Sequence, residues 1–202
     1  QGGRVKIGHA GTLDPLATGV LILATGKMTK QIEKLQTHTK EYVATIQLGA
    51  TTPSYDMEHE ENETFPTEHI TRELIETALQ QFIGDIEQVP PTYSAVKVNG
   101  QRAFDYRRNG EDIVLKPKNI RIDEIEIIHF DTDRMQLTLR VVCGKGTYIR
   151  ALARDLGRAI NSGAYLVALR RTRIGDIKVE ECINYDHFYE WLNQQNIEIV
   201  DK

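Results

Sequence analysis

Two segments of this chain place an apolar side chain at every second position, and this pattern limits its fold most strongly. In residues 42–48 the apolar positions run from Tyr42 to Leu48, and Gly49 ends the segment. Residues 135–143 repeat the pattern. Alternation at a period of two predicts strands that bury one face. A sheet is therefore expected in the core of the protein.

The rest of the chain interleaves helical and extended patterns. Further strands are predicted over residues 20–24, 93–99, 120–130 and 166–174. Helices are predicted over residues 26–35, 71–83, 148–160 and 186–194, with Thr71 and Asp186 as N-caps of the second and the last. Because several strand pairs look antiparallel, we expect an α+β fold with a mixed, largely antiparallel central sheet and flanking helices, rather than a doubly wound parallel sheet.

The length and composition suit a globular protein. The chain has 202 residues, of which 40% are apolar and 27% are charged, and this mixture is not that of a disordered chain. No window holds the roughly 18 consecutive apolar residues that a membrane span needs, so no integral membrane protein is expected. Cys143 and Cys182 are too few for a disulfide framework or a cysteine-rich zinc site, and a cytoplasmic location is expected.

The charge of the chain is unevenly distributed. Its net charge is −4, which by itself argues against a general nucleic-acid binder. Residues 51–100 carry two basic and ten acidic side chains, whereas residues 1–50 and 101–150 are net positive. Within the acidic part, residues 54–67 are predicted to form a solvated loop. One segment therefore accounts for the acidity.

The common signatures of metal and cofactor sites do not occur. The six histidines are scattered without metal-ligand spacing. The turn 144–147 holds a lysine between two glycines but lacks the earlier glycine of a phosphate-binding loop, and no Gly-x-Gly-x-x-Gly or Gly-x-Ser-x-Gly occurs. Neither a metal nor a cofactor is expected.

The most informative segment is residues 8–19, a loop of small residues that contains Asp14 followed by Pro15. A residue before proline is driven away from helical geometry, so the carboxylate of Asp14 is expected to project from a loop beside a core strand. Loops held in this way often carry catalytic groups. The alternative is that Asp14 caps a short turn through its own backbone. The residues of this loop leave both interpretations open.

Several motifs together resemble the TruB-type tRNA pseudouridine synthases. Residues 6–19 read KIGHAGTLDPLATG, which is similar to the signature of that family. Four further blocks follow in the family's order: KEY at residues 40–42, QVPPTYSAVK at 88–97, GKGTYIR at 144–150 and LRRT at 169–172. The resemblance covers about residues 5 to 177 and implies the pseudouridine synthase catalytic fold.

The resemblance implies a reaction and three catalytic residues. Such enzymes convert the T-loop uridine (U55) of tRNA to pseudouridine by breaking the C1′–N1 bond and rejoining the base through C5. Asp14 matches the catalytic carboxylate, and Arg150 matches the arginine that pairs with it. Tyr42 matches the tyrosine that stacks on the target base, although its strand pattern also fits a core residue. The sequence leaves open whether Asp14 attacks the sugar or the base.

The resemblance also implies a set of substrate-binding residues. His9 matches the histidine that helps to displace the target base, and Tyr148 and Leu169 match residues that line the uracil pocket. Arg107 and Arg108 fall in a basic insertion placed over the RNA, together with Arg102, Lys116 and Lys118. Core packing is the alternative for Tyr148 and Leu169, and a solvated basic face is the alternative for the insertion. Arg170 and Arg171 could hold phosphate or pair internally.

The extent of the chain departs from the family pattern at both ends. The family's first strand, with a Lys-Pro motif, is expected upstream of Gln1, and residues 178–202 are expected to form a short tail without a full PUA domain. We therefore expect residues 1–202 to form a single, N-terminally incomplete catalytic domain. Its expected partner is the T-arm stem-loop of tRNA, and it is expected to be a monomer that binds no membrane.

Three alternative functions remain at this stage. The first is a non-catalytic tRNA-binding or tRNA-folding protein on the same fold, although binding alone does not need Asp14. The second is a synthase of the same family that acts on another RNA. The third is an unrelated hydrolase with an aspartate nucleophile, which only the Asp-Pro loop supports.

Overall fold

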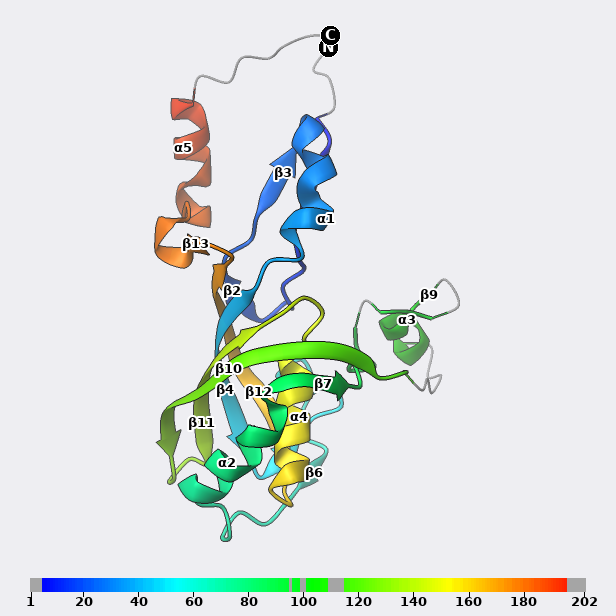
Figure 1. Cartoon of the computed structure of the whole chain (residues 1–202), viewed down its shortest axis with the longest axis vertical. Helices are drawn as coiled ribbons and strands as arrows, with labels where there is room; N and C mark the ends of the chain where they lie inside the picture. The colour runs from blue at the N-terminus through cyan, green and yellow to red at the C-terminus, as the bar shows by residue number, and fades with distance from the viewer. Residues whose placement is uncertain (1–4, 95, 99–100, 109–114, 196–202) are drawn as a thin grey trace.

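A seven-stranded sheet organises the protein in the computed structural model, which describes residues 5–94, 96–98, 101–108 and 115–195 (Figure 1). Its order is β13 (Ile177–Lys178), β12 (Ala164–Ile174), β4 (Lys40–Leu48), β11 (Gln136–Cys143), β10 (Lys118–Asp131) and β7 (Gly84–Gln88), and β2 (Ala17–Gly19) pairs with β12. Only the β2–β12 pairing is parallel; the other neighbours in this sheet run antiparallel. This is the mixed, largely antiparallel sheet that the sequence predicts.

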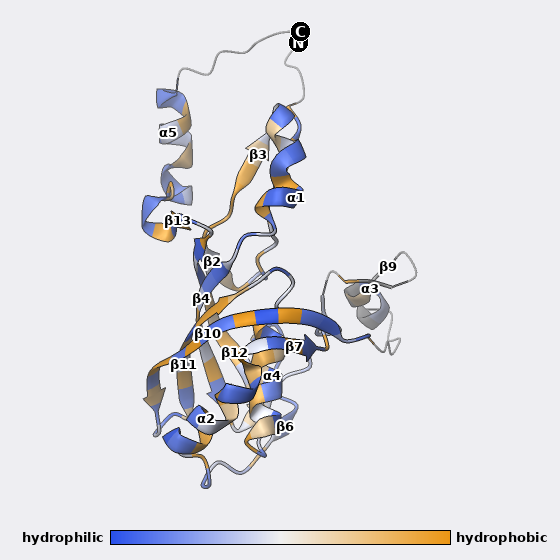
Figure 2. Ribbon diagram, viewed as in Figure 1, coloured by the Kyte–Doolittle hydropathy of each residue, from blue (hydrophilic) through white to orange (hydrophobic). Residues whose placement is uncertain are grey.

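The core lies between one face of this sheet and two helices, α2 (Arg72–Leu79) and α4 (Ile149–Ala159) (Figure 1). Strand β4 buries every second residue from Lys40 to Leu48, and β11 buries the alternate residues from Leu137 to Cys143. Apolar residues of both helices belong to the same buried cluster as those of the strands. Figure 2 shows the apolar residues of the helices and strands as orange bands. The two alternating segments therefore lie side by side, paired from Lys40 and Cys143 onward.

Strand β12 departs from simple alternation at two points. Its pairing with β4 shifts register between Leu166 and Ala168 and again between Arg171 and Arg173. Each shift is a β-bulge, in which one extra residue changes the face to which later side chains point. Thus Leu169 and Arg171 lie on the buried face, and three residues later Ile174 does so too. The strand itself is predicted by the sequence, but the bulges are not.

The remaining elements are short. Small strands are β1 (Ile7–His9), β3 (Leu23–Thr25), β5 (Ala50–Thr51), β6 (Glu63–Thr64), β8 (Lys97–Val98) and β9 (Gln101–Arg102). The other α-helices are α1 (Ile32–Leu35), α3 (Ala103–Arg108) and α5 (Phe188–Gln194), and the 3-10 helices are η1 (Gly26–Gln31), η2 (Gln80–Phe82), η3 (Val179–Glu181) and η4 (Tyr185–His187). No helix in the described part of the chain is long and apolar enough to cross a membrane.

The segment that follows the Asp14 loop differs from the sequence prediction. Residues 20–24 do not form a buried strand: only β3 forms there, it pairs with β1 in a two-stranded hairpin, and Leu23 is 54% exposed. The helix predicted over residues 26–35 is a 3-10 turn followed by one α-helical turn, with Met28 exposed. Leu23 therefore belongs to a small projecting hairpin rather than to a core strand, whereas Val20, which precedes the hairpin strand, is buried.

Two other predicted boundaries also change. The strand predicted over residues 93–99 is reduced to β8 within the described residues. The last helix begins at Phe188, and the side chain that caps the preceding 3-10 turn is that of Asn184, which accepts from the backbone N–H of Asp186 at 3.1 Å. By contrast, Thr71 caps α2 as predicted, since its hydroxyl accepts from the N–H of Leu74 at 3.2 Å.

Candidate active site

A cavity of about 320 Å³ opens where the loop carrying Asp14 meets β4, β12 and the first turn of α4. Its lining contains five of the residues singled out in the sequence: Asp14, Tyr42, Tyr148, Arg150 and Leu169. These residues are far apart along the chain, and the sheet brings them together. The cavity is therefore the candidate active site.

The Asp14 loop is fixed to the sheet at its far end by Gly19. Strand β2 pairs with β12, and Gly19 lies opposite Arg171. The φ angle of Gly19 is +103°, and a Cβ atom there would lie 2.1 Å from the carbonyl oxygen of Arg171. Only glycine adopts such a conformation at such a close approach. The loop therefore enters the sheet at one defined position.

Asp14 and Arg150 form a bidentate ion pair. Arg150 Nε lies 2.9 Å from Asp14 Oδ2, and Arg150 Nη2 lies 2.8 Å from Asp14 Oδ1. The arginine side chain is only 4% exposed, whereas that of Asp14 is 34% exposed and lines the cavity. Paired N–H donors of this kind fix both the position and the orientation of a carboxylate. The side chain of Asp14 is thus engaged by Arg150, 136 residues away, rather than by a local turn.

The other side of the Arg150 guanidinium is also held by the protein. Its Nη1 donates to the backbone carbonyl oxygens of Ser54 at 3.2 Å and Tyr93 at 2.9 Å. A second carboxylate, Asp56, lies behind it, with Oδ2 at 3.6 Å from Arg150 Nε. The guanidinium therefore has its position fixed from several directions.

Asp56 is a site residue that the sequence analysis misses. The prediction of a solvated loop over residues 54–67 is wrong at its start, because Ser54 and Asp56 are buried. Asp56 Oδ1 accepts hydrogen bonds from the Ser54 hydroxyl and from the backbone N–H of Glu58, the second at 3.0 Å. The remaining acidic residues of the loop are exposed, so one buried carboxylate is hidden among solvated ones.

Tyr42, Tyr148 and Leu169 form the less polar part of the cavity wall. Tyr42 faces the core from β4, opposite Arg171 of β12. Burial raises the pKa of the Tyr42 hydroxyl and the Cys143 thiol acts in the same direction, whereas the nearby Arg171 guanidinium lowers it. Burial likewise raises the pKa of Tyr148. Both phenols are thus held in the neutral form, which can donate or accept a hydrogen bond.

Of the predicted RNA-contacting residues, His9 lies outside this cavity. His9 is exposed on β1 and does not line it. Arg107 and Arg108 end α3, and their side chains lie outside the described part of the structure, as does that of Arg102.

Cations dominate the charged groups of the cavity wall, in which the described residues include Lys40, Lys145, Arg150 and Arg171 but only one carboxylate, that of Asp14. Lys40 is buried and its ammonium donates to the carbonyl oxygens of Gln36 and His38, the latter at 2.6 Å. Burial lowers the pKa of Lys40; the Cys143 thiol opposes this effect, and Arg171 and Lys145 add to it. Within the described residues, no cluster of histidine, cysteine and carboxylate groups could hold a metal ion. The cavity therefore suits an anionic ligand.

Residues 2–149 match the model of a protein family described as TruB family pseudouridylate synthase, N-terminal domain. The chain belongs to this family. Residues 150–200 match a second model, described as tRNA pseudouridylate synthase B C-terminal domain. The two matches meet at the start of α4, so the Asp14–Arg150 ion pair joins the two matched regions of this TruB-family chain.

Relatives and solved structures agree with this assignment. The tRNA pseudouridine synthase B of Phocaeicola vulgatus is 62% identical over 98% of this chain and 83% of its own length. A crystal structure of a Cbf5–Nop10–Gar1 complex aligns with 96% of this chain at a TM-score of 0.68 and 29% identity. The structure of an H/ACA RNP bound to a substrate RNA containing 2′-deoxyuridine aligns with 95% of this chain at a TM-score of 0.63 and 25% identity. The chain spans about half the length of those two solved chains.

Proposed function

We propose that this chain isomerises uridine 55 in the T-loop of tRNA to pseudouridine, with Asp14 as the catalytic carboxylate. The observation that carries the proposal is the bidentate pair between Asp14 and the buried Arg150 at the wall of a cation-lined cavity. Membership of a pseudouridylate synthase family supplies the type of reaction. The relatives named tRNA pseudouridine synthase B support tRNA as the substrate.

The reaction requires one bond to break and one to form. The C1′–N1 bond of the nucleotide breaks and the uracil turns while still bound. A C1′–C5 bond then forms as the hydrogen on C5 leaves as a proton, and N1, freed from the sugar, takes up a proton. A carboxylate can act as a nucleophile or stabilise a developing positive charge during such a step. Asp14 reaches the cavity while Arg150 fixes both of its oxygens, which supports this role.

The remaining cavity residues fit supporting roles in the same proposal. Tyr42 offers a flat ring against the base and a neutral hydroxyl for proton transfer. Tyr148 and Leu169 provide apolar surface for the uracil. Asp56 is a positioning residue, since it touches Arg150 and does not line the main cavity. A T-loop uridine must leave its stack to enter such a pocket, and His9, Arg107 and Arg108 are the proposed contacts for the RNA around it.

The location and assembly of the protein follow from the same proposal. A tRNA substrate in bacteria such as those of the relatives implies a cytoplasmic enzyme. Because Asp14, Tyr42 and Arg150 all belong to one chain, a monomer has the complete set of proposed catalytic residues. We propose that residues 1–202 act as one catalytic domain, because both family-matched regions contribute to the same ion pair and the same core.

The test is tritium release from a T-arm stem-loop labelled at C5 of uridine, measured with the full-length protein and without added metal or cofactor. Asp14→Asn keeps the size of the side chain and removes its charge, so release should fall below detection while binding of the same RNA persists. Glu60→Gln, at an exposed carboxylate, is the matched control and should release tritium normally. Unchanged release by Asp14→Asn would remove Asp14 from the mechanism. RNA binding by the native protein without any release would favour the binding-only alternative.

A further inference from the structure

Arg171 is a buried cation whose guanidinium donates hydrogen bonds to two backbone oxygens. It is 1% exposed and lines the active-site cavity. Within the described residues, no carboxylate lies within ion-pair distance of its guanidinium. Burying an arginine in this way is costly unless its N–H groups are used. The partners that it does have therefore indicate its role.

Those partners are the two ends of the Asp14 loop. Arg171 Nε donates to the carbonyl oxygen of Val20 at 2.8 Å, and Nη2 donates to that of Gly11 at 3.1 Å. The backbone of Arg171 adds a third tie, because its carbonyl oxygen accepts from the N–H of Val20 at 2.9 Å. One residue of β12 thus clamps both sides of the segment that carries Asp14.

The same guanidinium acts on Tyr42. Arg171 and Tyr42 are direct partners across β12 and β4, so their side chains lie on the same face of the sheet. The influence of Arg171 opposes the rise in the pKa of Tyr42 that burial causes. Arg171 is therefore linked to both groups that the proposed mechanism places against the nucleotide.

The direction of the Arg171 side chain depends on the β-bulge beside it. Thr172 is the extra residue, since Arg171 pairs with Tyr42 while Arg173 pairs with the adjacent Glu41. The Thr172 hydroxyl donates to Glu41 Oε1 at 2.8 Å and lies 3.2 Å from the Glu41 carbonyl oxygen. A bulge held in this way turns the preceding side chain toward the cavity and the following one toward the outer face.

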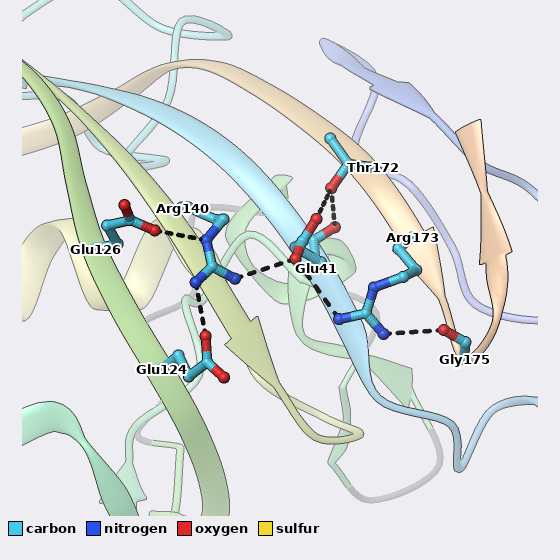
Figure 3. A network of polar contacts seen from close by, with 7 residues as sticks. All are labelled: Glu41, Glu124, Glu126, Arg140, Thr172, Arg173 and Gly175. Carbon is cyan, nitrogen blue, oxygen red and sulfur yellow. Dashed lines mark hydrogen bonds and ion pairs between the residues drawn. The ribbon is translucent and has the colours of Figure 1, made fainter. Parts of the chain in front are cut away.

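The outer face holds Glu41 in place through a network of ion pairs (Figure 3). Arg140 of β11 lies 3.1 Å from Glu41 and also binds Glu124 and Glu126 of β10, at 2.6 and 2.8 Å. Arg173 completes the network at 3.5 Å from Glu41. Four strands are thus tied together on the face opposite Tyr42 and Arg171, at the position of the bulge.

We propose that Arg171 is a positioning residue for Asp14 and Tyr42, and that the Thr172–Glu41 contact on the outer face fixes the bulge that directs it. This role rests on the function proposed above. It predicts that Arg171 acts on the chemical step more than on RNA affinity, because its Nε and Nη2 already donate to carbonyl oxygens of the Asp14 loop. A contact to phosphate would have the opposite effect.

The experiment measures kcat, KM and T-arm RNA affinity for full-length Arg171→Ala, Arg171→Lys and the wild type. We expect Arg171→Ala to lower kcat roughly 100-fold, since a misplacement of about 1 Å costs this much, with RNA affinity within about threefold. The lysine variant should recover part of kcat. Guanidinium ion added at millimolar concentration should also raise kcat of Arg171→Ala but not that of the wild type, because the deleted group borders a cavity that the ion can enter. Arg158→Ala, at an exposed arginine of α4, is the control.

Thr172→Val tests the bulge without deleting a buried cation. It should lower kcat about tenfold, whereas Thr138→Val, at an outer-face threonine of β11 whose hydroxyl pairs with that of Thr45, should not. Weaker RNA binding with unchanged kcat in Arg171→Ala would identify a phosphate contact and overturn the proposal, as would normal kcat in both Arg171→Ala and Thr172→Val. If the wild type releases no tritium from C5-labelled RNA, the proposed function fails first.

Discussion

Replacing Asp56 by asparagine tests whether the second carboxylate beside Arg150 stabilises the protein. The change preserves shape and removes one buried charge. Asp56 uses one oxygen for Ser54 and Glu58 and turns the other toward Arg150. An asparagine amide sets its NH2 group against a donor in either orientation, namely Arg150 Nε in one and the Glu58 N–H in the other. The variant therefore loses an ion pair, and its amide N–H also points at another N–H donor, with no acceptor between them.

The size of the effect follows from the burial of the pair. Removing one partner of a buried ion pair costs about 3–5 kcal/mol. Arg150 keeps both hydrogen bonds to Asp14, so we expect the lower limit, about 3 kcal/mol. A chain of this length loses roughly 2–4 °C in Tm for each kcal/mol. The Tm of Asp56→Asn should therefore fall by about 6–12 °C.

Thermal unfolding followed by circular dichroism measures this shift, and tritium release measures the activity that remains. We expect kcat to fall as well, because Asp14 is oriented by the same guanidinium that Asp56 supports. Glu60→Gln, an exposed carboxylate of the same loop, should leave Tm and kcat near their native values. A Tm within about 2 °C of the wild type would show that Asp56 contributes less than an ion pair to stability and would refute the reasoning.

Three further predictions concern stability. Gly19→Ala forces a Cβ against the Arg171 carbonyl at a φ of +103°, so calorimetry should show a loss well above the roughly 1–3 kcal/mol of backbone strain alone; a smaller loss would show that the loop can shift. Burial alone would raise the pKa of Glu41, but the Thr172 hydroxyl and the arginines beside it have the larger combined effect, so the pKa lies below its usual value. The stability that Glu41 contributes should therefore be present above about pH 4.5 and disappear as the pH falls through its lowered pKa. Urea titrations at a series of pH values should show that the free energy of unfolding of Glu41→Gln falls less steeply in acid than that of the wild type. Thr71→Ala removes the hydroxyl cap of α2 and should cost about 1 kcal/mol in the same titration; no change would mean that water replaces the cap.

Alternation and helical stripes were sufficient to predict the centre of the fold. The patterns over residues 42–48 and 135–143 identified two central strands, because each strand buries one face and keeps alternate residues on that face along its length. The segment 20–24 misled for the opposite reason. Val20 is buried beside β12, but Leu23 and Ala24 belong to a small projecting hairpin outside the main sheet. Local hydrophobicity does not reveal where a strand docks.

The candidate site was predictable where a motif carried it and not where packing did. Asp14 and Arg150 were paired only by family resemblance, since local patterns do not connect residues so far apart. Asp56 was hidden because its neighbours in the sequence are solvated acidic residues. The role of Arg171 stayed open because two bulges in β12 decide which face it occupies, and bulges leave no periodic signal.

Arg171 holds the Asp14 loop through main-chain carbonyl oxygens. These oxygens are present whatever the side chains of the loop are. Substitutions between Gly11 and Val20, other than at Gly19, can therefore alter the chemistry that the loop presents without removing the acceptors for Arg171. The parts that set the position of the loop and the parts that set its reactivity are thus separable. An engineer could exchange the reactive group of this loop while leaving its anchor untouched.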